Sequence, residues 1–282
     1  MTSALLPARE DLTVCFAHPA YAMKDMFDAR GTGISSIEVH TVEDLRRRLP
    51  EADVLVASVL WRNDMLGAAP RLRFLQSFSS GTNAYDLGAF RARGVFLASG
   101  AGVNMNAVSE HAMALLLSLT RRLGPARDDQ ARRVWGGEQD DQAPRAEELP
   151  GKTLLLVGLG QIGNRIAHLA RAFGMRVIAV RRTPGAGAGN ADEVHAFGAL
   201  GELIPAADAV VLCCPLTEET ANLIDAEALA RFRPGAVLVN VARGGCVDEA
   251  ALVDALRRGR LAGAGLDVTA SEPLAAGSPL WG

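Results

Sequence analysis

Lysine is nearly absent from this sequence. Only Lys24 and Lys152 among the 29 basic residues are lysines, and the arginines are dispersed without a long basic run. The excess of arginine is therefore a compositional bias. With 32 acidic residues the net charge is −3, and this balance argues against nucleic acid or an anionic membrane as the main partner.

Cysteine is also scarce, and its spacing is not that of a metal or disulfide framework. The four cysteines, Cys15, Cys213, Cys214 and Cys246, form no CxxC pair. We therefore expect neither a metal site nor a set of disulfides. Cys213 and Cys214 are adjacent in an apolar run typical of a strand, so their side chains should point to opposite faces.

A membrane-spanning segment is missing as well. The most apolar long stretch, Val103–Leu119, is too short and carries Asn106, Glu110 and His111, so it is not expected to span a bilayer. Residues 1–11 contain acidic side chains and no apolar core of a secretory signal. The expectation is a soluble protein of the reducing cytoplasm.

What the sequence does contain is a regular alternation of strands and helices, over 282 residues, enough for two domains. Such alternation predicts parallel sheets with crossover helices. The predicted fold class is α/β with two lobes: a flavodoxin-like, substrate-binding lobe over residues 1–101 and a Rossmann-type, doubly wound, NAD(P)-binding lobe over 102–282. Thr41 and Asp44 approximate a capping box for a helix over 42–49. The strands expected in the first lobe are Leu12–Phe16, Ile37–His40, Val54–Ser58, Phe74–Phe78 and Val95–Ala98.

The second lobe is expected to begin with a long helix over about Asn106–Leu123. Its apolar residues fall at helical spacing, and the pair Arg121–Arg122 suits the negative end of the helix dipole. Residues 124–150 are polar with proline and glycine, and should form a surface arm. The other expected strands are Thr153–Val157, Arg176–Val180, Ala209–Cys213, Ala236–Val241 and Ala262–Val268, and the other helices are Gln161–Phe173, Ala226–Arg231 and Glu249–Arg258.

A glycine-rich turn joins the strand at 153–157 to the helix that follows it. Residues 154–163 read LLLVGLGQIG. Gly158 permits the tight turn, Gly160 lets the backbone approach a pyrophosphate, and Gly163 lets helix and strand pack closely. A glycine turn alone can be purely structural, but strand, motif, helix and second strand occur here in order. This order predicts a dinucleotide site, with the pyrophosphate on the free N–H groups of the helix.

The second strand of this lobe ends in Arg181-Arg182-Thr183, where NAD-binding proteins carry an acidic residue for the ribose 2′-hydroxyl. Two guanidiniums and a hydroxyl can instead bind a 2′-phosphate. The plain alternative is an exposed basic strand end. We expect NADP(H) to be preferred, with NAD(H) possible.

Two charged residues follow neighbouring strands further on. Arg243 lies in a glycine-flanked turn, 239-VNVARGG, and Glu272 precedes the proline that ends the segment 267-DVTASEP. An arginine at this sheet edge can hold a carboxylate with two parallel hydrogen bonds. Each residue alone would be an ordinary ion-pairing residue or loop acid. Their placement at neighbouring strand ends of a dinucleotide unit indicates a site.

These motifs together resemble the D-isomer-specific 2-hydroxyacid dehydrogenases, a family that includes phosphoglycerate, glycerate and formate dehydrogenases and the glyoxylate/hydroxypyruvate reductases. The resemblance covers nearly the whole chain. It disfavours another Rossmann enzyme, such as an alanine-dehydrogenase-like protein. The residues that carry it are 79-SSGTN, 102-GVN, Ser109-Glu110, Gly158–Gly163, 215-PLT, 240-NVARGG and Asp267 with Glu272-Pro273.

The resemblance implies an oxidoreductase that transfers a hydride between NAD(P)H and a 2-oxo acid or D-2-hydroxy acid. Arg243 would bind the substrate carboxylate, Glu272 would orient and polarise a catalytic histidine, and backbone groups around Ser80 and Gly81 would hold the substrate. The long helix and the segment around Trp135 resemble the family's dimer contacts, so a homodimer is expected. The implied cofactor contacts, besides the glycine turn and Arg181–Thr183, are Thr82, Gln161, Ile162, Cys214, Pro215, Val241, Ala242 and Asp267.

The histidine that the resemblance implies is missing. In the family it follows the Glu-Pro segment, whereas none of the five histidines here follows Glu272. His111 is the nearest substitute by topology, although a plain helix residue is the favoured interpretation. We expect a fragment of a longer enzyme, incomplete at its C-terminal end. The alternative is a natural chain without the acid/base residue, acting as a cofactor-binding sensor or inactive paralogue.

Overall fold

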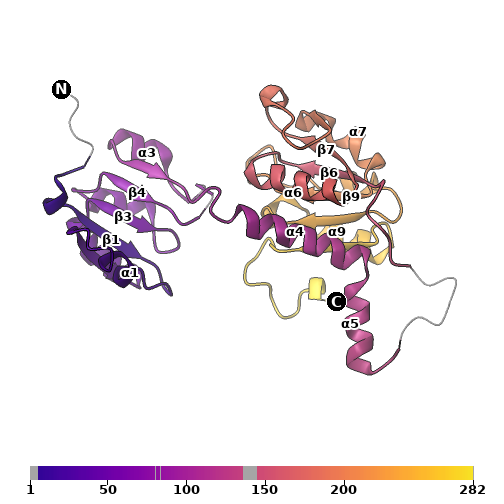
Figure 1. Ribbon diagram of the computed structural model, residues 1–282, viewed down its shortest axis with the longest axis horizontal. Helices are drawn as coiled ribbons and strands as arrows, with labels where there is room; N and C mark the ends of the chain where they lie inside the picture. Colours follow the sequence, from indigo (N-terminus) through magenta and orange to yellow (C-terminus); the bar gives the residue numbers. More distant parts are fainter. Residues whose placement is uncertain (1–5, 80, 83, 136–144, 282) are drawn as a thin grey trace. The chain divides into compact units, whose positions relative to one another are not determined.

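The computed structural model describes residues 6–79, 81–82, 84–135 and 145–281. The chain divides into two compact units, Met1–Asn104 and Met105–Gly282. The division therefore follows residue 104, where the sequence led us to expect 101. Each unit is built on a parallel sheet (Figure 1).

Unit 1 has a five-stranded parallel sheet in the order β2-β1-β3-β4-β5, which is the flavodoxin-like order. Helix α2 begins as predicted, because Oγ1 of Thr41 accepts a hydrogen bond from the amide of Asp44 at 3.0 Å. The strands are β1 (Thr13–Ala17), β2 (Ser35–Val39), β3 (Val54–Ala57), β4 (Phe74–Gln76) and β5 (Phe96–Ala98), and the helices are α1 (Lys24–Asp28), α2 (Val42–Arg48) and α3 (Leu87–Ala92).

Unit 2 has a six-stranded parallel sheet in the order β11-β10-β9-β6-β7-β8. With β6 as the first strand, this is the order of the doubly wound dinucleotide-binding fold. The strands are β6 (Thr153–Val157), β7 (Arg176–Val180), β8 (Glu193–His195), β9 (Ala209–Leu212), β10 (Val237–Asn240) and β11 (Gly263–Leu266). The helices are α4 (Met105–Thr120), α5 (Leu123–Arg132), α6 (Gln161–Ala172), α7 (Leu200–Leu203), α8 (Ala226–Ala230) and α9 (Glu249–Arg257).

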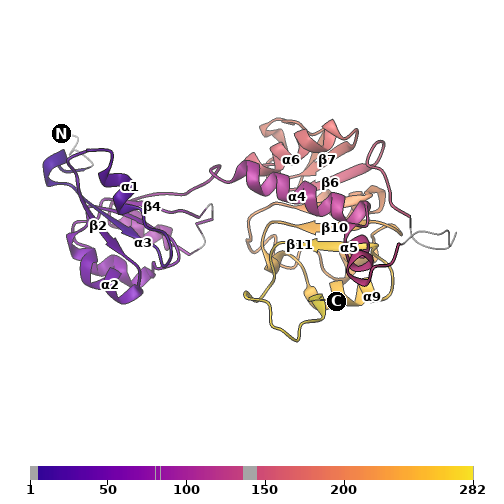
Figure 2. The same cartoon turned by 60° about the horizontal axis from the view of Figure 1, so that its bottom comes forward.

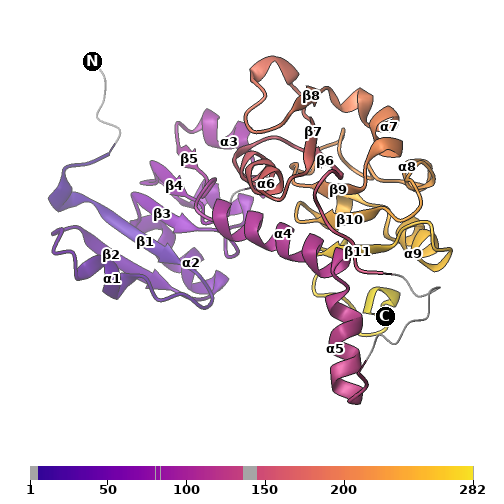
Figure 3. The same ribbon diagram turned by 45° about the vertical axis from the view of Figure 1, so that its right-hand side comes forward.

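Helices cover both faces of the second sheet. On one face α4 and α6 lie side by side (Figure 2), and on the other lie α7, α8 and α9 (Figure 3). Successive residues of β6 alternate between the two layers: Leu154 packs with the first pair of helices and Leu155 with the second group. Cys213 and Cys214 likewise belong to opposite layers, which confirms the prediction for their side chains.

The first part of the predicted surface arm over 124–150 is helical, because α5 forms there. Arg122 has a left-handed backbone (φ 56°), which ends α4 and starts α5 in a new direction, away from the sheet (Figures 1 and 3). No residue of α5 is buried, so the helix leaves no apolar period in the sequence. The short strand β8 was also missed, because its residues are only half-buried and form no apolar run. None of the helices in the described ranges is long and apolar enough to cross a membrane.

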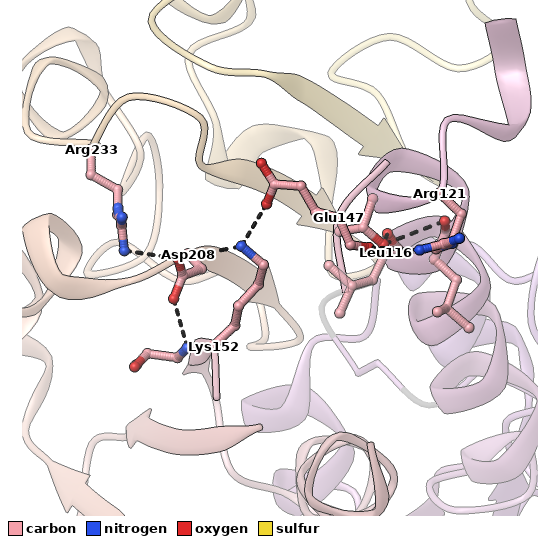
Figure 4. A network of polar contacts seen from close by, with 9 residues as sticks. Leu116, Arg121, Glu147, Lys152, Asp208 and Arg233 are labelled. Carbon is pink, nitrogen blue, oxygen red and sulfur yellow. Dashed lines mark hydrogen bonds and ion pairs between the residues drawn. The ribbon is translucent and has the colours of Figure 1, made fainter. Parts of the chain in front are cut away.

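A polar network fastens the start of β6 at the amino edge of the second sheet (Figure 4). Asp208, just before β9, accepts hydrogen bonds from the amide of Thr153 at 2.7 Å and from Arg233 at 2.8 Å. Lys152 lies between two carboxylates, with Nζ 2.5 Å from Glu147 and 3.8 Å from Asp208. These contacts hold the segment before β6 against the sheet.

An equivalent polar network holds the start of β1 in unit 1. Asp53, just before β3, is 3% exposed and accepts a hydrogen bond from the amide of Thr13 in β1 at 2.9 Å. The guanidinium of Arg71 binds both carboxylate oxygens, at 2.7 and 3.1 Å. In each unit, an aspartate just before a strand that pairs with the unit's first strand (β3 with β1, β9 with β6) accepts a hydrogen bond from the first amide of that first strand.

Candidate functional site

The glycine turn between β6 and α6 has a different constraint at each glycine. Gly158 has φ +103°, and a Cβ on it would lie 2.9 Å from the amide nitrogen of Cys214. A Cβ on Gly163 would lie 2.2 Å from the carbonyl oxygen of Gly158. At Gly160, by contrast, a Cβ would meet no heavy atom within 4 Å. The backbone is therefore packed at two glycines and open to a ligand at the third.

This open turn forms one wall of a groove of about 330 Å³. The groove lies at the carboxyl ends of β6, β7 and β9, the edge at which doubly wound folds bind ligands. It brings together seven residues that the sequence singled out for the cofactor: Gly158, Gly160, Arg181, Arg182, Thr183, Cys214 and Pro215.

The basic end of β7 is open within this groove. Neither guanidinium, of Arg181 or of Arg182, bonds to any side chain or carbonyl of the described residues. The following loop is fixed to α6 by Asn164, whose Oδ1 accepts a hydrogen bond from the amide of Asn190 at 2.7 Å. A fixed loop beside two unpaired guanidiniums suits an anionic ligand.

The turn that carries Arg243 is shaped by Asn240, a residue without a predicted role. Asn240 is 1% exposed. Its Oδ1 accepts from the amide of Ala242 at 2.9 Å, and its Nδ2 donates to the carbonyl of Arg243 at 3.0 Å. Arg243 itself is exposed, with Nη1 donating to the carbonyl of Ala242 at 2.7 Å. The sequence signal for this role was the side-chain amide of Asn240, at the end of an otherwise apolar strand.

The turns of Arg243 and Glu272 are packed against each other. A Cβ on Gly244 would lie 1.9 Å from the carbonyl carbon of Thr269, so only glycine fits there. Glu272 is exposed, and its Oε1 accepts from the amide of Thr269 at 3.1 Å. Glu249, at the start of α9, accepts from the amide of Ala270 at 2.5 Å. Two neighbouring strand ends thus present a guanidinium and a carboxylate from one corner, where their turns are in contact.

Comparison with known proteins decides the family. Residues 113–282 match the family model of the D-isomer specific 2-hydroxyacid dehydrogenase, NAD binding domain. The chain belongs to this family.

Relatives and solved structures agree with this assignment. The D-3-phosphoglycerate dehydrogenase of Mycobacterium leprae is 39% identical over 229 residues, which cover 80% of this chain and 42% of that protein. The glyoxylate reductase of Pyrococcus furiosus is 36% identical over 237 residues, covering 82% and 70%. A crystal structure of a D-isomer specific 2-hydroxyacid dehydrogenase family protein from Aeromonas salmonicida has a TM-score of 0.80 at 32% identity, covering 96% and 86%. The chain spans about two fifths of the length of the phosphoglycerate dehydrogenases it matches.

The other residues implied by the 2-hydroxyacid dehydrogenase family are spread over both units. Gln161 and Ile162 are the first residues of α6, and Val241 and Ala242 are buried just after β10. Gly81 and Thr82 lie in unit 1, after β4. Ser80 lies outside the described residues.

Asp267 follows β11 and contacts His111, the histidine that we named from the sequence as the nearest substitute for the missing one. Its Oδ1 is 3.2 Å from Nε2 of His111 in α4. Asp267 and Glu272 both line a second cavity, of about 650 Å³, beside β11. Among the described residues, no three His, Cys, Asp or Glu side chains are grouped closely enough to hold a metal ion.

The thiol at the groove wall belongs to a hydrogen-bonded pair. A hydrogen bond between Cys214 and Cys246 raises the pKa of Cys214 and lowers that of Cys246 to about 7. Burial raises the pKa of Cys213, on the other layer, to about 12. Cys214 therefore stays a neutral thiol at this wall of the groove.

Proposed function

We propose that the protein transfers a hydride between a nicotinamide cofactor and C2 of a 2-oxo acid or D-2-hydroxy acid. The observation that carries this proposal is the corner formed by the Arg243 and Glu272 turns. It lies at the carboxyl edge of the same sheet as the open glycine turn. A carboxylate-binding group and a general acid/base partner are what 2-oxo acid reduction needs beside the cofactor.

We assign separate roles in this reaction to Arg243 and Glu272 of unit 2. The exposed guanidinium of Arg243 binds the substrate carboxylate, which fixes C2 and its oxygen. Glu272 would accept a hydrogen bond from an imidazole that protonates the oxygen of C2; the family resemblance places that histidine after Glu272, and none of the five histidines of this sequence lies there. A bound nicotinamide supplies the hydride. The room beside Gly160 fits its pyrophosphate, because no protein atom occupies the place of a Cβ there.

The test is consumption of NADPH or NADH with a panel of 2-oxo acids, measured for the wild type and two variants. Arg243→Ala should lower kcat/KM about 10- to 100-fold, since a hydrogen bond between charged groups contributes about 1.5–3 kcal/mol, while cofactor affinity stays nearly unchanged. Arg258→Ala, which removes an exposed arginine paired with Asp254 on α9, is the matched control. Cofactor binding without turnover of any 2-oxo acid would contradict the proposed reaction.

We propose further that NADP(H) is preferred. The open guanidiniums of Arg181 and Arg182 support this, together with the hydroxyl of Thr183 in the same groove. Arg181→Ala should weaken NADPH binding and leave NADH binding unchanged, with Arg171→Ala in α6 as the control. Equal losses for both cofactors, or tenfold tighter binding of NADH to the wild type, would overturn the preference.

We also propose a homodimer in the cytoplasm. The arm after α4 supports the dimer, because Leu123 and Val134 are each 54% exposed and Trp135 is 96% exposed, and such apolar groups favour association. The four free thiols suit a reducing compartment. Light scattering on the wild type and on Trp135→Ser should show a dimer that the substitution weakens, and a monomeric wild type would refute it.

A further inference from the structure

His111 and Asp267 meet at the carboxyl edge of the second sheet, although 156 positions separate them in the sequence. The distance from Nε2 to Oδ1 is 3.2 Å. Both side chains are about half exposed, at 48% and 45%. The pair is therefore accessible from solvent, and Oδ2 of Asp267 can accept a hydrogen bond from another group.

Close packing of α4 on β11 sets up this contact. A Cβ on Gly263 would lie 2.9 Å from Cδ2 of Leu119, and a Cβ on Gly265 would lie 3.0 Å from Cβ of Leu115. Four residues of helix and two residues of strand both advance by about 6 Å. The next step along each element therefore places His111 over Asp267. The two glycines let the helix approach closely enough for the side chains to meet.

We propose that His111 is a positioning residue for the nicotinamide half of the cofactor site, an inference that rests on the proposed function. Asp267 is among the cofactor contacts implied by the family resemblance, and His111 is not. With its Nε2 3.2 Å from Oδ1, His111 restricts the orientation of the Asp267 carboxylate. Oδ2 is then left to accept a hydrogen bond from the primary amide of the nicotinamide ring.

The strand order explains why the pair acts on this half of the cofactor. Arg181, which we assign to the adenosine 2′-phosphate, follows β7 on one side of β6, whereas Asp267 follows β11 on the other side. The two halves of a dinucleotide lie on opposite sides of the first strand in doubly wound folds. The His111–Asp267 pair is therefore out of reach of the adenosine half.

This separation gives an experiment in which binding is the readout. Wild type and His111→Ala are titrated with NADPH and with 2′-phospho-ADP-ribose, which lacks the nicotinamide; NADH and ADP-ribose form a second pair. His111→Ala should weaken NADPH binding about 3- to 10-fold, the range expected for one hydrogen bond. Its affinity for 2′-phospho-ADP-ribose should stay that of the wild type.

Three variants separate positioning from a general structural effect. His111→Gln, which keeps an N–H donor, should restore most of the affinity for NADPH. His168→Ala removes an exposed histidine of α6 and should change nothing. The double variant His111→Ala/Asp267→Ala should bind NADPH no more weakly than Asp267→Ala alone, because His111 acts through the carboxylate.

The outcomes distinguish this inference from the proposed function beneath it. Unchanged NADPH affinity in His111→Ala, an equal loss for NADPH and 2′-phospho-ADP-ribose, or additive losses in the double variant would each overturn the role of His111 alone. A wild type that binds none of the four ligands would overturn the proposed function and this inference together.

Discussion

The glycine turn before α6 permits a prediction in which two similar substitutions differ in their effect on stability. Gly163→Ala places a methyl group 2.2 Å from the carbonyl oxygen of Gly158 and 3.0 Å from Sγ of Cys213. Gly160→Ala places the same methyl group where no heavy atom lies within 4 Å. The first substitution therefore strains the folded protein, and the second fills space that we assign to the cofactor pyrophosphate.

The magnitude follows from these distances. To restore ordinary contact, α6 must move away from the turn by about 1 Å, and overpacking of this kind costs about 1–3 kcal/mol. Better helix propensity returns at most about 1 kcal/mol. At about 2–4 °C for each kcal/mol in a unit of this size, Gly163→Ala should lower Tm by several degrees. Gly160→Ala should leave Tm within about 2 °C, because only small capping and chain-entropy effects remain.

Thermal unfolding and NADPH titration of both variants provide the test. We expect Gly160→Ala to bind NADPH at least about tenfold more weakly at nearly wild-type stability, since the methyl group displaces a phosphate from the backbone N–H groups. Gly163→Ala should lose both stability and affinity. Wild-type Tm in Gly163→Ala would refute the packing argument, and wild-type affinity in Gly160→Ala would refute the position of the pyrophosphate.

Three further predictions concern stability. Asp208→Ala should lower the free energy of unfolding in urea by about 1–3 kcal/mol, because a half-buried amide and Arg233 lose their acceptor and Lys152 loses one of its two carboxylate neighbours. Asp208→Asn should lose less, and equal losses would contradict this. Burial raises the pKa of Cys15 and Cys213 from 9.0 to about 12. Cys15, which is buried, should thus resist a thiol reagent until unfolding. Stability should fall as pH rises from about 9 toward 12, because only the unfolded thiols then lose protons; a flat profile there would count against it. Gly244→Ala, whose methyl group would overlap Thr269, should lower Tm more than Gly163→Ala. A smaller effect would show that the turns of Arg243 and Glu272 can move apart at little cost.

The sequence carries the features that depend on local pattern. Apolar runs of a few residues predict the buried strands, since parallel strands covered on both faces need no polar alternation. The segment 154–163 predicts a strand, a turn and a helix, because a positive φ and close backbone contacts admit only glycine. The same segment, with the motifs around Arg243 and Glu272, is sufficient to indicate the family.

The features missed by sequence reasoning depend on long-range contacts or have no pattern of their own. Helix α5 buries no side chain, so no apolar period marks it. Asn240 acquires its role only when the chain turns back over it after β10. The contact between His111 and Asp267 requires α4 to lie on β11, and this depends on two glycines and two leucines that match in register. The sequence by itself therefore determined the strands other than β8, the glycine turn and the residue types at the carboxyl edge of the second sheet. Only the tertiary structure decided which side chains meet there, because packing between distant segments sets those distances.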